Sequence, residues 1–279
     1  MKKLYAVLGD PIGHSMSPIM HNDLFEHYKI DAHYLPFHIK NENLEDAVKG
    51  LKALGVGGFN ITVPHKSAII PFLDVVDELA LNLGAVNTVV NDGGKFIGYN
   101  TDGHGFLRGL NAYMPTLDGK KVLILGAGGA ARGLYFTLAL ERPMVIDIAN
   151  RTLEKASSLI EACPYSIASN AFTLEEAGRR LVEYDLIIQT TTIGMSPRIA
   201  ELPVNVTNLK KNAVVCDIIY NPLETLFLQE AKLKGASIQN GIDMFVYQGA
   251  LAFEKWTGIF PDIERMKNNV LQQLGGKTC

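Results

Sequence analysis

Apolar runs and amphipathic segments alternate along this chain of 279 residues. Runs that are mostly apolar are typical of strands buried on both faces of a sheet, whereas apolar residues every three or four positions indicate a helix with one buried face. The first pattern occurs at 4–8, 122–125, 144–149, 185–188 and 213–222. The second occurs at 44–54, 130–138 and 225–234. This alternation predicts an α/β protein, and the length allows two domains.

Weaker strand and helix patterns of the same two kinds occur in the first hundred residues. The further strands expected there are 32–39, 59–63, 84–90 and 96–99, with a hairpin turn at 91–95. The further helices expected there are 18–28 and 74–83. Pro18 would occupy the first turn of its helix with Ser17 as the N-cap, because proline is favoured at that position and a serine hydroxyl can accept from exposed helix N–H groups.

The most informative motif lies near mid-chain, where the strand 122–125 leads into Gly126-Ala127-Gly128-Gly129-Ala130-Ala131. In this G-x-G-x-x-A pattern the first glycine forms a tight turn, the second lets the backbone approach a pyrophosphate, and the small third residue lets helix and strand pack closely. We therefore predict a dinucleotide-binding domain of the Rossmann type, with a tight turn that binds no ligand as the alternative. No Lys-Ser or Lys-Thr follows, which argues against a nucleoside-triphosphate P-loop.

The end of the next strand, 144–149, bears on which dinucleotide is bound. A carboxylate there would bind the ribose hydroxyls of NAD, whereas a neutral or cationic end admits the 2′-phosphate of NADP. The chain has Asn150-Arg151-Thr152 at this point, and the Arg151 guanidinium suits a phosphate. NADP is therefore predicted, although Arg151 could be a surface arginine. Asp147 lies inside the strand and would favour NAD only if the strand ended earlier.

Polar side chains near the ends of the N-terminal strands are candidates for ligand binding. Ser15 lies in a loop rich in proline and glycine, and its hydroxyl has no capping duty there. Asn60 and Thr62 share one face of a strand because side chains alternate along it, and both suit hydrogen bonds to ligand hydroxyls. Lys66 follows directly and is a candidate for proton transfer, although a lysine is more often a solvated surface residue.

Two further candidates are Asn87, in the strand 84–90, and Asp102, which precedes a helix expected at 103–110. Asp102 would either cap that helix or face Lys66 and accept a hydrogen bond from the same substrate hydroxyl. The spacing along the chain leaves both interpretations open.

Composition excludes several classes of protein. The chain has 26 basic and 29 acidic residues, mixed along its length, so neither nucleic acid nor an anionic membrane is an expected partner. Cys163, Cys216 and Cys279 are far apart and are expected to be free thiols in a reducing cytoplasm. The histidines lack metal-ligand spacing, and neither a signal peptide nor a membrane span is expected. Small molecules are the expected partners, and a homodimer is left open.

Four motifs, in order, resemble the shikimate dehydrogenases of aromatic amino-acid (chorismate) biosynthesis. They are GDPIGHSMSP at 9–18 with His21-Asn22, NITVPHK at 60–66, GAVNT at 84–88 and GYNTDG at 98–103. The resemblance extends through DIIYNP at 217–222 and GIDMFVYQ at 241–248. It implies an N-terminal α/β substrate domain with a mixed sheet (1–103, completed by helices in 242–279), an NADP-binding Rossmann domain (104–241) and a cleft between them.

The resemblance also implies roles for single residues. Lys66 and Asp102 would be the catalytic pair, with Lys66 taking the proton from the substrate C3 hydroxyl as hydride leaves that carbon. The residues that would bind substrate are Ser15, Ser17, Asn60, Thr62, Lys66, Asn87, Asp102, Tyr220 and Gln248. Those that would contact the cofactor are Gly126, Ala127, Gly128, Gly129, Ala130, Asn150, Arg151, Thr152, Thr191, Met195 and Gly241.

Two positions depart from the pattern of the family. Gln189 stands where asparagine is usual, which puts hydrogen bonding near the cofactor in question, and Phe245 replaces a leucine. The activity implied is the reversible, NADP-dependent reduction of 3-dehydroshikimate to shikimate. The alternatives are an NAD-preferring quinate/shikimate dehydrogenase, which Ser15 and Arg151 oppose, and a non-catalytic nucleotide-binding regulator, which the presence of both Lys66 and Asp102 opposes.

Overall fold

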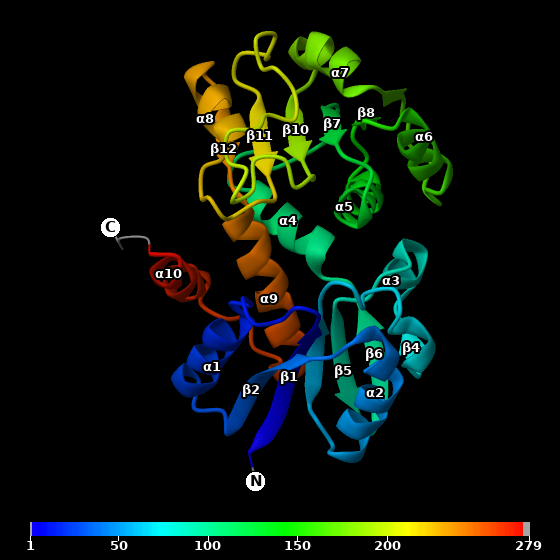
Figure 1. Ribbon diagram of the computed structural model, residues 1–279, viewed down its shortest axis with the longest axis vertical. Helices are drawn as coiled ribbons and strands as arrows, with labels where there is room; N and C mark the ends of the chain where they lie inside the picture. The colour runs from blue at the N-terminus through cyan, green and yellow to red at the C-terminus, as the bar shows by residue number, and fades with distance from the viewer. Residues whose placement is uncertain (1, 276–279) are drawn as a thin grey trace. The chain divides into compact units, whose positions relative to one another are not determined.

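A computed structural model describes residues 2–275 and confirms the α/β class. The chain divides into two compact units. Unit 1 comprises the residues up to Gly105 together with those from Val246 onward, and unit 2 is Phe106–Phe245. The chain passes between them within two helices, α4 (Asp102–Leu110) and α9 (Gly241–Thr257). In Figure 1, the N-terminal strands in blue and cyan, most of α9 and the C-terminal helix in red belong to unit 1.

Unit 1 contains a six-stranded mixed sheet in the order β2-β1-β3-β5-β6-β4. Its strands are β1 (Lys3–Gly9), β2 (Ala32–His38), β3 (Gly58–Ile61), β4 (Val75–Val76), β5 (Thr88–Asp92) and β6 (Lys95–Tyr99). β1 runs parallel to β2 and β3, whereas β5 runs antiparallel to both β3 and β6. The helices of this unit besides α4 and α9 are α1 (Ser17–His27), α2 (Leu44–Ala53), α3 (Glu78–Leu83) and α10 (Ile263–Gln273).

The two faces of this sheet follow from side-chain alternation along β1. Ala6 and Leu8 are buried in a cluster with Val48 of α2. Tyr5 points the other way, and its ring lies 5.1 Å from that of Phe25 in α1 and 5.0 Å from that of Trp256 in α9. The second face is therefore completed by the C-terminal part of the chain.

Unit 2 contains a six-stranded sheet that is parallel throughout its described pairings, in the order β12-β11-β10-β7-β8-β9. Its strands are β7 (Lys121–Leu125), β8 (Val145–Ala149), β9 (Ala171–Phe172), β10 (Leu186–Gln189), β11 (Val214–Asp217) and β12 (Ser237–Gln239). Its helices include α5 (Gly129–Leu140), α6 (Leu153–Glu161), α7 (Leu174–Arg180) and α8 (Leu226–Leu233). The strand order is that of the Rossmann fold, so this part of the prediction is confirmed.

Two expected elements of unit 1 start later than the sequence pattern predicts. The helix expected at 74–83 begins at Glu78, because the Asp77 carboxylate accepts from the Leu79 N–H as an N-cap and the residues before it pair with β6. The strand expected at 84–90 begins at Thr88, since Gly84 takes a left-handed conformation that ends the preceding helix.

One predicted helix start and one predicted strand end are also wrong. Ser17 is the first residue of α1, not its N-cap; Met16 takes the capping position, and the Ser15 hydroxyl, for which no such role was expected, accepts from the Ser17 N–H at 3.3 Å. The strand expected at 213–222 ends at Asp217, whose carboxylate accepts from the Ile219 N–H and turns the chain out of the sheet. Both differences arise from local hydrogen bonds that hydrophobic spacing does not report.

Candidate functional site

Lys66 and Asp102 lie together in unit 1. The Lys66 Nζ donates to Asp102 Oδ2 at 2.6 Å, although 36 positions separate the two residues. Lys66 follows the end of β3, where its carbonyl accepts from the Val86 N–H at 2.8 Å, and Asp102 is the first residue of α4. The side chains are 32% and 20% exposed, so the pair is partly sheltered and still open to a ligand.

The Asp102 carboxylate is held from its other side by Asn87. The Asn87 Nδ2 donates to Asp102 Oδ1 at 2.8 Å and lies 3.5 Å from Gln248 Oε1 in α9. The Asn87 Oδ1 accepts from the Thr101 N–H at 2.9 Å, and the Thr101 hydroxyl donates to the Gln248 carbonyl at 3.1 Å. One amide therefore orients the carboxylate toward the lysine, and three chain segments meet at it.

Thr101 is part of this cluster, and sequence reasoning missed it. It is buried, and it lies in the run Gly98–Gly103 that the sequence pattern already singles out. His65 was also missed. Its Nε2 lies 2.6 Å from the Ile39 carbonyl, which ties the turn before Lys66 to the end of β2. The only sequence signal for either residue was its adjacency to a candidate.

The other predicted substrate ligands of unit 1 differ in how far they are exposed. Ser15 and Thr62 are half-buried, whereas Ser17 and Asn60 are buried. The Asn60 Oδ1 accepts from the Tyr34 hydroxyl at 2.7 Å, and its Nδ2 lies 3.2 Å from the Asn87 carbonyl. The Asn60 amide therefore links β3 to the segment that carries Asn87, in addition to any ligand contact.

In unit 2, the glycine motif forms the turn that the sequence predicts. Gly126 has φ +115°, which an L side chain rarely adopts, and a Cβ there would lie 2.5 Å from the Thr190 hydroxyl. Gly128 is the N-cap of α5, and no described atom lies within 4 Å of a Cβ built at Gly128 or Gly129. The start of this twelve-residue helix is therefore open, as a bound pyrophosphate requires.

The structure also answers the question raised by Asp147. This carboxylate is buried inside β8, where it accepts from the Tyr184 hydroxyl at 2.7 Å and from the Asn170 backbone N–H at 2.8 Å. It is therefore occupied and cannot serve as the terminal carboxylate that binds a ribose. The strand ends at Ala149, so exposed Arg151 and Thr152, with half-buried Asn150, follow it directly.

The remaining predicted residues of unit 2 lie in loops after β10 and β11 and at the start of α9. Thr191 is half-buried and Met195 is exposed. The Tyr220 ring packs 5.4 Å from that of Phe245, and burial raises the pKa of its hydroxyl. Gly241 begins α9, and any Cβ there would overlap the Ile218 carbonyl oxygen, so packing alone already demands glycine at this position.

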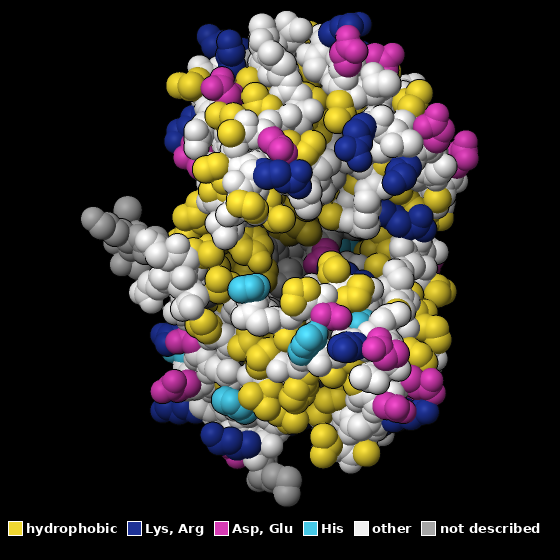
Figure 2. Space-filling view, viewed as in Figure 1, with side chains coloured by type: hydrophobic (Ala, Val, Ile, Leu, Met, Phe, Trp, Pro, Cys, Tyr) yellow, Lys and Arg dark blue, Asp and Glu magenta, His cyan; other side chains and the backbone are white. Residues whose placement is uncertain are grey.

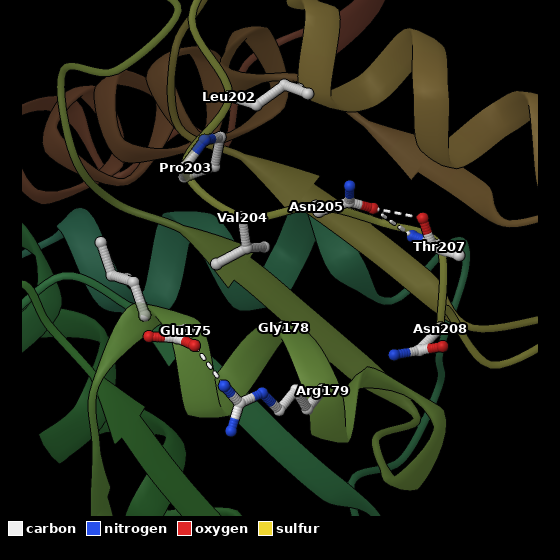
Figure 3. Close-up of a pocket in the computed structure, with 10 residues that line it drawn as sticks. Glu175, Gly178, Arg179, Leu202, Pro203, Val204, Asn205, Thr207 and Asn208 are labelled. Carbon is white, nitrogen blue, oxygen red and sulfur yellow. Dashed lines mark hydrogen bonds and ion pairs between the residues drawn. The ribbon is translucent and has the colours of Figure 1, made fainter.

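A surface groove of about 610 Å³ lies elsewhere in unit 2, between α7 and the segment 202–208 (Figure 3). Arg179 and Glu175 of α7 form an ion pair at its edge. The groove contains none of the candidate residues, so it plays no part in the site. On the face drawn in Figure 2, Lys and Arg side chains are interspersed with Asp and Glu.

Within residues 2–275 no three His, Cys, Asp or Glu side chains gather as a metal ion would require. No helix in the same range is both long and apolar enough to cross a membrane. Cys163 and Cys216 are free thiols, and Cys279 lies outside the described residues.

Comparisons with known proteins agree on one family. Residues 7–89 match the family model of the shikimate dehydrogenase substrate binding domain, 110–222 that of shikimate/quinate 5-dehydrogenase, and 241–271 that of the shikimate 5′-dehydrogenase C-terminal domain. A relative from Bacillus anthracis named shikimate dehydrogenase (NADP(+)) is 59% identical over 99% of this chain and 100% of its own length.

Solved structures resemble the whole chain as well. Shikimate 5-dehydrogenase from Thermus thermophilus, in complex with NADP(H) and shikimate, is 34% identical with a TM-score of 0.87 over 97% of this chain and 99% of that one. Quinate dehydrogenase from Corynebacterium glutamicum, in complex with NAD, is 28% identical with a TM-score of 0.89 over 97% and 99% of the two chains. The predicted resemblance is confirmed: this chain belongs to the shikimate dehydrogenase family.

Proposed function

We propose that this chain is an NADP-dependent shikimate dehydrogenase in which Lys66 and Asp102 transfer the proton. Its reaction is the reversible reduction of 3-dehydroshikimate to shikimate in aromatic amino-acid biosynthesis. The observation that carries the catalytic assignment is the 2.6 Å contact of Lys66 Nζ with Asp102 Oδ2, made by two partly exposed side chains and braced by Asn87. The proposed substrate ligands other than Tyr220 lie in unit 1, and the proposed dinucleotide ligands lie in unit 2.

In the direction of reduction, the Lys66 ammonium donates a proton to the carbonyl oxygen at C3 of the substrate and is left as an amine. NADP supplies the hydride chemistry when bound. In oxidation, the hydroxyl O–H bond breaks and its proton returns to Lys66 Nζ. Asp102 accepts from that nitrogen throughout, which fixes its position, and Asn87 holds the carboxylate in turn.

The assignment of substrate ligands adds further side chains to this pair. Ser15, Ser17, Asn60, Thr62, Asn87, Tyr220 and Gln248 are proposed to bind the hydroxyls and carboxylate of the substrate. Half-buried Ser15, Thr62 and Gln248 suit direct contact, whereas the buried amide of Asn60 also holds neighbouring segments together. A set of neutral donors and acceptors at a partly sheltered site matches a ligand with several hydroxyls.

The cofactor assignment is supported by two turns of unit 2, the one that follows β7 and the one that follows β8. Gly126, Ala127, Gly128, Gly129 and Ala130 would receive the pyrophosphate at the open start of α5. Asn150, Arg151 and Thr152 would receive the 2′-phosphate, because Asp147 is held inside β8. Thr191, Met195 and Gly241 are proposed to lie near the ribose or nicotinamide. The free thiols at Cys163 and Cys216 accord with the cytoplasm as the compartment.

The test crosses shikimate and quinate with NADP and NAD in initial-rate measurements on the purified protein. We expect shikimate with NADP to be the best pair. In Lys66→Ala the loss of the proton donor should lower kcat by about 100-fold or more, while shikimate binding measured by calorimetry is largely kept. Asp102→Asn should lower kcat as well, because the lysine loses its charged partner.

Lys52→Ala is the matched control, since Lys52 pairs with Asp74 at 2.7 Å in the same unit and has no proposed role. Near-normal turnover of Lys66→Ala would remove the proton-transfer assignment. A preference for quinate or NAD would overturn the specificity, and inactivity of the wild-type protein with all four combinations would favour a non-catalytic regulator.

A further inference from the structure

Gln189, one of the two residues that depart from the family pattern, is the last residue of β10 and is fully buried. Its amide makes three hydrogen bonds to the loop that follows. The Oε1 accepts from the Thr191 N–H at 2.5 Å, and the Nε2 lies 3.2 Å from the Thr191 carbonyl and 2.9 Å from the Ile193 carbonyl. One side chain therefore provides hydrogen-bond partners for one backbone N–H and two backbone carbonyls of the loop that follows β10.

That loop packs directly against the glycine turn. Both the N–H and the hydroxyl of Thr190 donate to the Leu125 carbonyl, at 2.9 and 2.7 Å. At Gly126, the next residue, the space that a Cβ would fill is taken by Thr190 Oγ1 and Thr191 Cγ2, at 2.5 and 3.0 Å. The position of the loop and the position of the glycine turn are thus fixed together.

The length of the Gln189 side chain matters to this arrangement. An asparagine can accept from the N–H two residues ahead, as in an Asx turn, and would keep the bond to Thr191. The bond to Ile193 spans four residues and uses the additional methylene of glutamine. A glutamine here therefore ties down more of the loop than the usual asparagine could.

We propose that Gln189 is a positioning residue for the cofactor: its amide holds the segment 190–193 against Gly126 in the geometry that binds NADP. The inference rests on the proposed function, because it takes the glycine turn and Thr191 to contact the dinucleotide. Gln189 itself does not touch the ligand; it acts through the backbone of the loop.

Two variants separate positioning by hydrogen bonds from simple filling of space. Gln189→Met keeps the length of the side chain and removes all three hydrogen bonds, whereas Gln189→Asn leaves a gap and keeps the bond to the Thr191 N–H. Affinity is measured by the fluorescence change of NADPH on titration, and KM values for NADP and shikimate are measured by initial rates. We expect the dissociation constant of NADPH to rise about tenfold or more in Gln189→Met and about threefold in Gln189→Asn.

The KM for shikimate should stay within about twofold in both variants, because the Gln189 amide bonds to Thr191 and Ile193, neither of which is a proposed substrate ligand. Gln239→Met is the control. Gln239 is a buried glutamine at the end of β12, and its amide bonds Cys216 and Asp243 rather than the loop. NADPH affinity should be near that of the wild type in this variant.

The opposite order, with Gln189→Met close to the wild type and Gln189→Asn weaker, would show that Gln189 only fills space and would overturn the inference. Equal loss of NADPH affinity in Gln239→Met would overturn it as well. If the wild type binds NADPH but turns over no shikimate, the proposed reaction fails while the order of NADPH affinities still tests the role of Gln189.

Discussion

His21 makes the stability of unit 1 sensitive to acid. It lies in α1 with no exposed surface, its ring 4.6 Å from that of Tyr34 and 5.2 Å from that of Trp256. Neither ring nitrogen has a hydrogen-bond partner among the described residues. Burial among these rings lowers the pKa of His21 from 6.5 to about 3, because a charged imidazolium would lose its hydration without gaining a partner.

The unfolded chain binds a proton at His21 near pH 6.5, and the folded chain does so only near pH 3. Between these values the unfolded state holds more protons, so the free energy of unfolding falls as pH falls, by about 1.4 kcal/mol per pH unit. Going from pH 6.5, where the unfolded imidazole is half protonated, to pH 4.5 should therefore cost about 2 kcal/mol through this one side chain. That is a large share of the stability of an ordinary domain.

The assay is urea unfolding at a series of pH values, compared between the wild type and His21→Phe. Phenylalanine keeps an aromatic ring in the stack and removes the site that titrates. Trp256 is the only tryptophan of the chain and lies in unit 1, so its fluorescence follows the unfolding of that unit. The difference in free energy of unfolding between the two proteins should grow by about 2 kcal/mol in favour of the variant from pH 6.5 to pH 4.5.

His33→Gln serves as the control, since His33 is exposed on β2 and its removal should leave the acid dependence of stability unchanged. If the curves of free energy against pH for the wild type and His21→Phe ran parallel, His21 would have to be protonated in the folded protein. The account of a buried, neutral imidazole would then be wrong.

Three further substitutions test packing and the glycine turn. Trp256→Phe removes the 2.9 Å hydrogen bond from the indole N–H to the buried Val89 carbonyl and should lower the free energy of unfolding by about 2 kcal/mol, measured by urea and circular dichroism. Gly126→Ala forces a Cβ onto Thr190 and should lower both thermal stability and NADPH affinity. Gly129→Ala has open space, so stability should be kept or raised while NADPH affinity falls; unchanged affinity would place the pyrophosphate elsewhere.

Much of the fold could be predicted because hydrophobic spacing reports burial directly. The apolar runs of unit 2 are strands of one parallel sheet, and the glycines after β7 form the turn that their spacing indicates. The helix expected at 74–83 was too long because the cap at Asp77 decides where it begins. Such a cap is visible in the sequence only when the helix boundary is already known.

The arrangement of the candidate site was less accessible to sequence reasoning. Spacing could place Lys66 and Asp102 at the ends of elements but could not show that they meet, since this depends on how the mixed sheet is ordered. The approach of Gln248 to Asn87 bridges 161 positions and depends on the return of the chain through α9. Alternation placed Asn60 and Thr62 on one face of a strand but could not show that the Asn60 amide is buried and bonded to Tyr34, because alternation does not tell which polar face is covered.

The return of the chain to unit 1 through α9 also sets the order in which the two units can fold during synthesis. Unit 2 is one uninterrupted stretch, so all of its residues have been made before the ribosome reaches Val246. Unit 1 begins first but lacks Phe253 and Trp256, which lie against Phe25, His21 and Tyr5, until the last part of the chain appears. The first hundred residues therefore leave the ribosome with an aromatic surface uncovered, and the domain translated second is the one able to fold first.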